Sequence, residues 1–114
     1  MLIEHRGRVP QVHPTAYIAP TAVLCGAVRV GPDARVLFGA VLTAEDGEIG
    51  VGARCVIMEN ALVRGRAAHP AILGDDVLAG PHAHVNGLPR DAPATERMTR
   101  QAAWFGAHRD DVQR

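Results

Sequence analysis

The chain has 114 residues, with twelve basic and twelve acidic side chains, so its formal net charge at pH 7 is zero. This balance does not favour a nucleic-acid or membrane-surface partner, and the length corresponds to one domain. Aromatic residues make up only 4% of the chain, which argues against a wide core and favours a narrow one filled by Val, Ile, Leu and Ala.

No apolar run is long enough to span a bilayer, and the first residues lack the apolar segment of a signal peptide. We therefore expect a cytoplasmic protein. The sequence has two cysteines, Cys25 and Cys55. The first is predicted to point outward and the second inward on a different face, so we expect two reduced thiols.

An aliphatic residue recurs at every sixth position through most of the chain, and a small residue usually follows four places later. A period of six fits neither a helix nor a simple hairpin series, and it is typical of parallel β-helices. Three hexads would form one triangular coil, with the aliphatic side chain pointing inward from each short strand. The positions in this frame are Val12, Ile18, Leu24, Val30, Val36, Leu42, Val51, Ile57, Val63, Leu73, Ala79 and Val85.

In chain order, residues 1–9 are expected to form a lead-in strand or cap. Coil one follows at 12–29, coil two at 30–47, coil three at 51–68, and coil four begins at 73–87. The spacing widens to nine after Leu42 and to ten after Val63. Both breaks follow the third face, so loops at 44–50 and 66–72, the first of them acidic at 45–48, are predicted to leave from one corner.

The sequence thus predicts an all-β protein, a single-stranded parallel β-helix of about four coils at residues 1–87. Residues 88–114 are predicted to form a carboxy-terminal tail. Within this tail residues 94–105 are a candidate helix, with Met98, Ala102 and Phe105 along one face. We expect this face to pack on the prism or on a neighbouring subunit.

Four segments carry a family resemblance: residues 39–45, 49–54, 56–60 and 77–87. They resemble the γ-class carbonic anhydrases of the hexapeptide-repeat, or isoleucine-patch, superfamily, which also contains trimeric acyltransferases. The resemblance implies left-handed coils, a homotrimer and sites between subunits. It also implies a chemistry in which three histidines hold zinc and leave a position for a water molecule of lowered pKa.

Carried over by residue, the three histidine positions hold Arg64, Pro81 and Asn86 in this sequence. Arginine stays protonated and cannot be a ligand, and proline has no side-chain donor atom. The family's polar residues near the metal align with Met58 and Val56, and its structural arginine and aspartate align with Thr43 and Glu45. We therefore expect no metal cofactor at this position.

The frame also predicts an outward column on the third face, formed by Cys25, Thr43, Arg64 and Asn86. Arg64 is expected to pair there with Glu45 or Glu59, within or between subunits. An alternative role is anion binding by Arg64 together with Arg66.

Two enzymatic alternatives remain open beside a non-catalytic, degenerate trimer, which is the leading interpretation. His82 and His84, two apart on an expected strand, could form a shifted zinc site with His69 and retain carbonic anhydrase activity. His69 could instead be the general base of a hexapeptide acyltransferase. The sequence identifies no small-molecule substrate.

Overall fold

The computed structural model describes residues 1–87, and the predicted tail with its candidate helix lies outside the described residues. All regular structure in the described part is β. The strands are β1 (Leu2–Ile3), β2 (Gln11–Val12), β3 (Tyr17–Ile18), β4 (Val23–Val30), β5 (Arg35–Val36), β6 (Val41–Val51), β7 (Val56–Ile57), β8 (Leu62–Arg64), β9 (Ala71–Leu73), β10 (Leu78–Ala79) and β11 (His84–Asn86).

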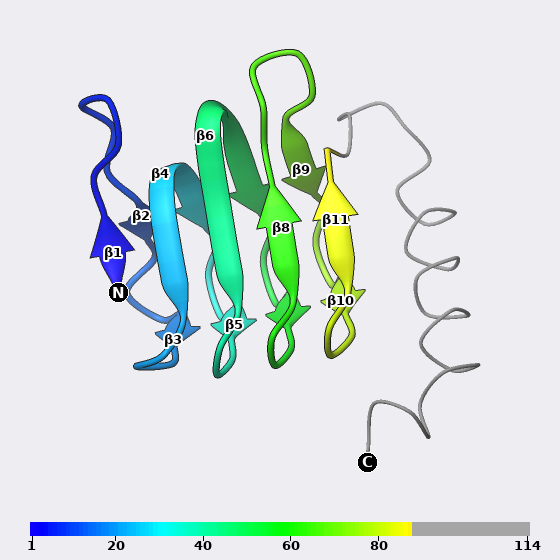
Figure 1. The fold of residues 1–114 in the computed structure, drawn as a ribbon. Helices are drawn as coiled ribbons and strands as arrows, with labels where there is room; N and C mark the ends of the chain where they lie inside the picture. Colours follow the sequence, from blue (N-terminus) through cyan, green and yellow to red (C-terminus); the bar gives the residue numbers. More distant parts are fainter. Residues whose placement is uncertain (88–114) are drawn as a thin grey trace.

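Every strand pair is parallel, and the register follows the hexad frame. One ladder joins Val12, Val30, Val51 and Leu73 in successive coils. The second joins Ile18, Val36, Ile57 and Ala79, and the third joins Leu24, Leu42, Val63 and Val85. Figure 1 shows the third ladder as neighbouring strands β1, β4, β6, β8 and β11. The predicted fold class, an all-β left-handed parallel β-helix of about four coils, is confirmed.

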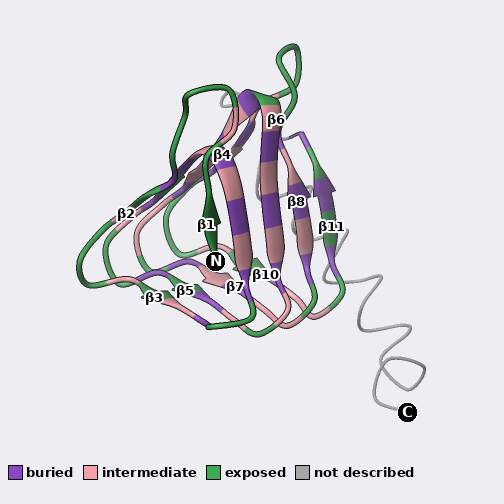
Figure 2. Cartoon of the chain, turned by 60° about the vertical axis from the view of Figure 1, so that its left-hand side comes forward, coloured by how far each residue is buried: buried purple, intermediate pink, exposed green. Residues whose placement is uncertain are grey.

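The core is a column of aliphatic side chains inside the prism. Burial alternates residue by residue along β4, and along β6 except at Glu45 and Asp46, as Figure 2 shows, because successive side chains in a strand point to opposite faces. Leu24, Leu42 and Val63 are fully buried. Small residues at the corners, such as Ala40 and Ala61, are also buried. No coil could hide these groups alone, so each coil depends on its neighbours.

The lead-in forms a strand, as expected: β1 pairs with β4 through Leu2↔Leu24 and Ile3↔Cys25. The expectation for the acidic segment 45–48 needs a correction, because these residues stay extended inside β6. Their extra length is taken up by a register shift opposite Gly26 and Val28 of β4.

The segment 45–48 of β6 and the turn at 66–69 lie at the same corner, and a third excursion, at residues 5–8, joins them there. Residues 5–8 turn back through an antiparallel bridge between His5 and Arg8, and residues 66–69 do so through Arg66 and His69. Figure 1 shows both excursions at the end of the prism face where β6 bends. We call these three segments, 5–8, 45–48 and 66–69, the corner tips.

In coils two to four, the other two corners use a left-handed backbone three places after the aliphatic residue. A proline precedes this residue at two of these corners, Pro32 before Asp33 and Pro81 before His82, and its fixed φ suits the first turn position. The non-glycine residues with φ of 59° or 60° at these corners are Asp33, Arg54, Asn60, Asp76 and His82. Pro81 therefore occupies a corner position equivalent to that of Pro32.

One corner carries an ion pair between coils three and four. Arg54 donates from Nε to Oδ1 of Asp76 at 2.8 Å and from Nη2 to Oδ2 at 3.0 Å. The hydrogen bond from this guanidinium lowers the pKa of the Asp76 carboxyl. Both side chains are more than half exposed, so the pair fixes the geometry of the corner more than it stabilises the fold.

The cysteines are two free thiols, as predicted. Cys55 is buried in an inward corner position and donates from Sγ to the Gly74 carbonyl oxygen at 2.8 Å. Burial raises the pKa of this thiol, which makes it a packing group. Within residues 1–87, no helix is long and apolar enough to cross a membrane.

Candidate functional site

The outward column on the third face is assembled by strand register. Cys25 lies opposite Thr43, Thr43 opposite Arg64, and Arg64 opposite Asn86. Neighbouring strands are about 4.8 Å apart, so the side chains of this column are in contact range. Two of the three predicted ligand positions, Arg64 and Asn86, are therefore neighbours on one face of one chain.

Arg64 forms an ion pair with Glu45, which joins β8 to β6. The two side chains are 39% and 40% exposed, so they lie at the edge of solvent. Two side-chain atoms nearby are buried without a hydrogen-bond partner, Nε of Arg64 and Oε1 of Glu59. Among the described contacts, Glu59 is not the partner of Arg64. Unpaired buried polar atoms are uncommon, and they often mark a place completed by another group.

Pro81 lies apart from the other two positions in the single chain. It occupies the turn before β11, whereas Asn86 is the last residue of that strand. The donor set does not fit zinc, which prefers imidazole nitrogen, thiolate or carboxylate ligands. A guanidinium has no free lone pair for a metal, and Asn86 offers only an amide.

The candidate histidines are separated by the fold. The expectation that His82 and His84 share a strand is wrong, because His82 lies at a corner with φ of 60° and β11 begins at His84. His69 lies on a corner tip beside Gly87. A Cβ added at Gly87 would lie 2.8 Å from the Cβ of His69. Across residues 1–87, no three His, Cys, Asp or Glu side chains are grouped so as to hold a metal ion.

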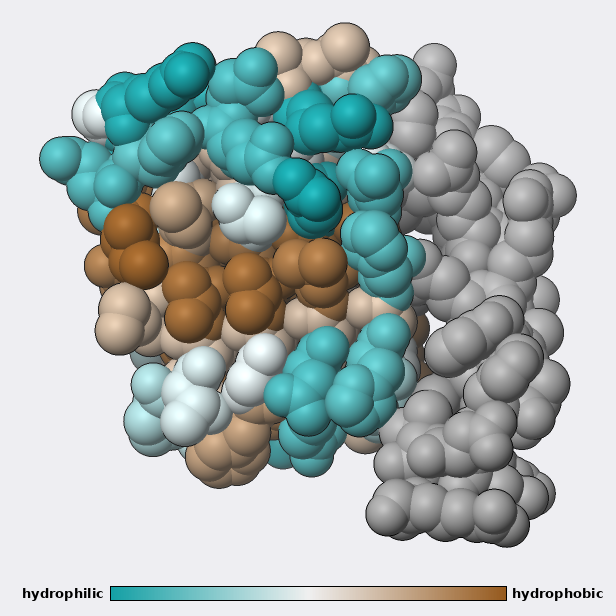
Figure 3. Space-filling view, viewed as in Figure 1, coloured by the Kyte–Doolittle hydropathy of each residue, from teal (hydrophilic) through white to brown (hydrophobic). Residues whose placement is uncertain are grey.

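The face around this column is apolar. Figure 3 shows a hydrophobic band across the strands β1, β4, β6 and β8, with hydrophilic surface above and below it. Its members belong to the core strands but point outward, and they are partly exposed in the single chain. They are Ile3, Val23, Val41 and Leu62.

The hexad pattern does not predict the amino-terminal corner tip. Arg8 donates from Nη1 to the Gly47 carbonyl oxygen at 3.4 Å, and the Ala67 backbone N–H donates to Asp46 at 3.1 Å. The corner tip 45–48 is therefore held by hydrogen bonds from the other two tips. Gly7, with φ of 77° inside a charged run, was a signal that could have indicated this turn.

The fold and the repeat together define a hexapeptide-repeat β-helix protein. No family model matches the chain. It is 35% identical over 86 residues to gamma carbonic anhydrase 3, mitochondrial, of Arabidopsis thaliana, with 70% of this chain and 33% of that protein covered. It is 34% identical over 88 residues to the carnitine operon protein CaiE of Escherichia coli, with 75% and 45% covered.

A solved structure from Bacillus cereus, described as a candidate acetyltransferase, superposes with a TM-score of 0.74 at 23% identity. The match covers 76% of this chain and 51% of that one, and it shows the fold alone. Gamma carbonic anhydrases are thus among the homologues of this chain, and the predicted resemblance is confirmed. The chain spans about a third of the length of the Arabidopsis relative and less than half of CaiE.

Proposed function

We propose that this chain is a degenerate, non-catalytic relative of the gamma carbonic anhydrases that acts as a homotrimeric scaffold. One observation carries the proposal: the arginine at the first ligand position is engaged in an ion pair with Glu45 of the neighbouring strand. An Arg–carboxylate pair can take the place of a bound metal at this position. A fixed guanidinium would also repel a divalent cation.

The exterior of the prism supports the trimer. The third face carries the apolar band described above, and the second face also carries partly or largely exposed apolar side chains. Those of the second face are Tyr17, Leu37, Val56, Met58 and Leu78. The first face is less apolar, because most of its outward positions are polar residues and glycines, among them Gln11, Arg29, Gly31 and Gly52, and Ile72 is an apolar exception. When two unlike faces pack on each other from copy to copy, they form a closed ring if the rotation between copies closes.

The trimer would also account for the unpaired polar atoms. The Nε of Arg64 and Oε1 of Glu59 are the two buried side-chain atoms without a partner in the described part of one chain. Both belong to coil three, Arg64 on the third face and Glu59 at the turn that leads into it. A polar group from a second copy, reached by a small side-chain movement, would satisfy them.

The loss of ligands can be tested by restoring them. The combined changes Arg64→His, Pro81→His and Asn86→His should produce a protein that takes up about one zinc ion per chain, measured by elemental analysis after dialysis. The expected reason is that Arg64 and Asn86 are neighbours in the column, and Pro81 of an adjacent subunit would face them in a trimer.

A matched control moves the same changes to the first face. Gln11 and Arg29 are also neighbours in register, and Pro32 is also a corner residue. Histidines at these three positions should leave the zinc content at background. If the third-face variant stays folded and trimeric but takes up no more zinc than this control, the assigned ligand positions are wrong.

A further inference from the structure

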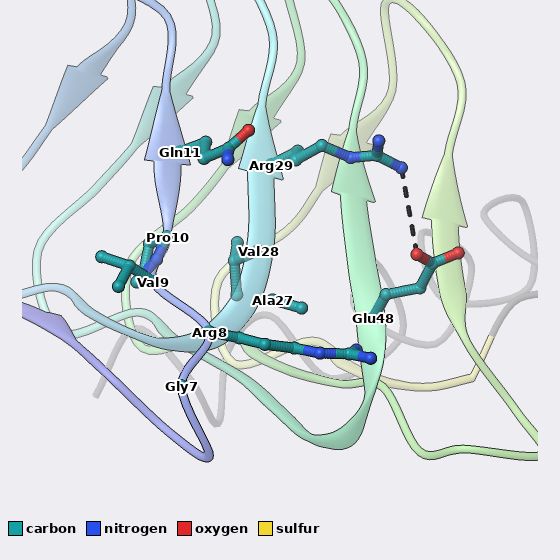
Figure 4. Close-up of a pocket in the computed structure, with 9 residues that line it drawn as sticks. All are labelled: Gly7, Arg8, Val9, Pro10, Gln11, Ala27, Val28, Arg29 and Glu48. Carbon is teal, nitrogen blue, oxygen red and sulfur yellow. Dashed lines mark ion pairs between the residues drawn. The ribbon is translucent and has the colours of Figure 1, made fainter.

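A groove opens between the lead-in and strand β4, on the first-face side of the corner tips (Figure 4). It exists because β4 pairs with β1 only at Leu24 and Cys25, and with β2 only at Arg29 and Val30. Between these two pairings the lead-in swings outward through the tip 5–8. The stretch 26–28 of β4 therefore lacks a described strand on that side.

Two arginines extend across the groove toward the same acidic residue. In Figure 4 the side chain of Arg8 runs toward the strand that carries Glu48, and Arg29 reaches toward its carboxylate. Arg29 Nη2 lies 4.0 Å from Glu48 Oε2, and Arg8 Nη1 lies 3.4 Å from the Gly47 carbonyl oxygen. Each guanidinium has five N–H donors, so these long contacts use little of its capacity.

The rest of the lining is apolar and small. Val9, which is 52% exposed, forms one side, and Ala27 forms the floor beside it. Gln11 adds an amide near Arg29. The groove lining carries two arginines and one glutamate, and Arg8 also borders a neighbouring hollow with Arg6, Glu45 and Asp46.

We propose that this groove binds a small organic acid through its carboxylate. The carboxylate lies between the guanidinium groups of Arg8 and Arg29, which match its planar geometry, and a short aliphatic part lies over Val9 and Ala27. Glu48 is an internal competitor, because its own carboxylate occupies the position of the ligand charge when the groove is empty. Binding therefore breaks the Arg29–Glu48 pair.

The inference is independent of the proposed function, since Arg64, Pro81 and Asn86 do not line the groove. Its test is calorimetric titration of the full chain with butyrate, acetate and inorganic phosphate at constant ionic strength. Butyrate should bind saturably in the millimolar range and more tightly than acetate, because of its longer aliphatic part. Arg29→Gln should weaken butyrate binding about fivefold or more, which corresponds to a charge contact near the surface.

Three variants sharpen the result. Glu48→Gln should tighten butyrate binding about threefold by removing the competing charge. Arg29→Lys should keep part of the affinity, because the positive charge remains. It should lose the rest, because lysine lacks the planar pair of donors that arginine presents to a carboxylate. Arg35→Gln, an exposed arginine on β5, is the matched control and should change nothing.

Several outcomes would overturn the proposal. Butyrate that does not saturate, or an equal loss in Arg35→Gln and Arg29→Gln, would mean that the attraction is only general charge. If Glu48→Gln does not bind butyrate more tightly, Glu48 does not compete with the ligand, and the assigned position of the carboxylate is wrong. If phosphate binds more tightly than butyrate, the groove binds an inorganic oxyanion rather than a carboxylate.

Discussion

Replacing Gly52 by alanine should destabilise the prism by about 1–3 kcal/mol, the usual cost of overpacking a closely packed site. A Cβ at Gly52 would lie 2.6 Å from the backbone C and O of Gly74 and from Oδ1 of Asp75, all in the next coil. Coil four would have to move away, which would stretch the hydrogen bond from the Gly52 N–H to the Leu73 carbonyl oxygen. Denaturant unfolding measures the effect.

The matched control is Gly74→Ala, one coil further along. Gly74 follows its aliphatic residue as Gly52 does, but a Cβ there would meet nothing within 4 Å among the described residues. Neither glycine has a left-handed φ, so alanine imposes no backbone strain at either position. Gly74→Ala should be neutral or slightly stabilising through the unfolded state. Equal losses in the two variants would contradict the account of coil stacking.

Leu42→Ala should have the larger effect, a loss of about 2–5 kcal/mol in the free energy of unfolding. Leu42 is fully buried and lies in the middle of the third ladder, between Leu24 and Val63. Its removal leaves a cavity that the strands on both sides cannot close, because their register is fixed by the backbone ladder. Chemical denaturation at a fixed protein concentration measures the change.

Leu78→Ala is the control for this substitution. Leu78 lies on β10 but is 56% exposed in the single chain, so its removal opens no internal cavity. At protein concentrations low enough to dissociate the trimer, the loss should stay within about 0.5 kcal/mol. A loss as large as that of Leu42→Ala under these conditions would mean that the inward and outward positions have been assigned wrongly.

The sequence predicted the fold well because inward positions of a β-helix admit few residue types. Val30 pairs with Val51 and Leu42 with Val63, as counting along the frame requires. The spacings of nine and ten located two corner tips for the same reason, since an interrupted hexad must resume on the correct face. The register can be read from the sequence because only aliphatic or small side chains fit the inward positions.

Other features do not depend on inward-facing core residues, so the hexad pattern could not predict them. The segment 45–48 stays in β6 because its neighbours hold it from both sides, which a local pattern does not reveal. His82 adopts a left-handed turn although it is neither glycine nor asparagine, because the corner imposes that conformation. The groove beside Arg29 depends on where the lead-in leaves the sheet, and no repeat marks that point.

The site was predictable to the extent that it depends on register. The column of Thr43, Arg64 and Asn86 follows from the frame, and the structure has it. The choice between Glu45 and Glu59 as the partner of Arg64 depends on side-chain geometry at a corner, which the sequence left open.

Native mass spectrometry of the purified wild-type protein tests the central claim most directly, because one spectrum reports both the number of chains and the bound metal. We expect a mass of three chains without stoichiometric zinc, even after incubation with zinc and dialysis. A complex with about one zinc ion per chain would contradict the account and direct attention to His69, His82 and His84. A stable monomer at micromolar concentration would contradict the trimeric scaffold.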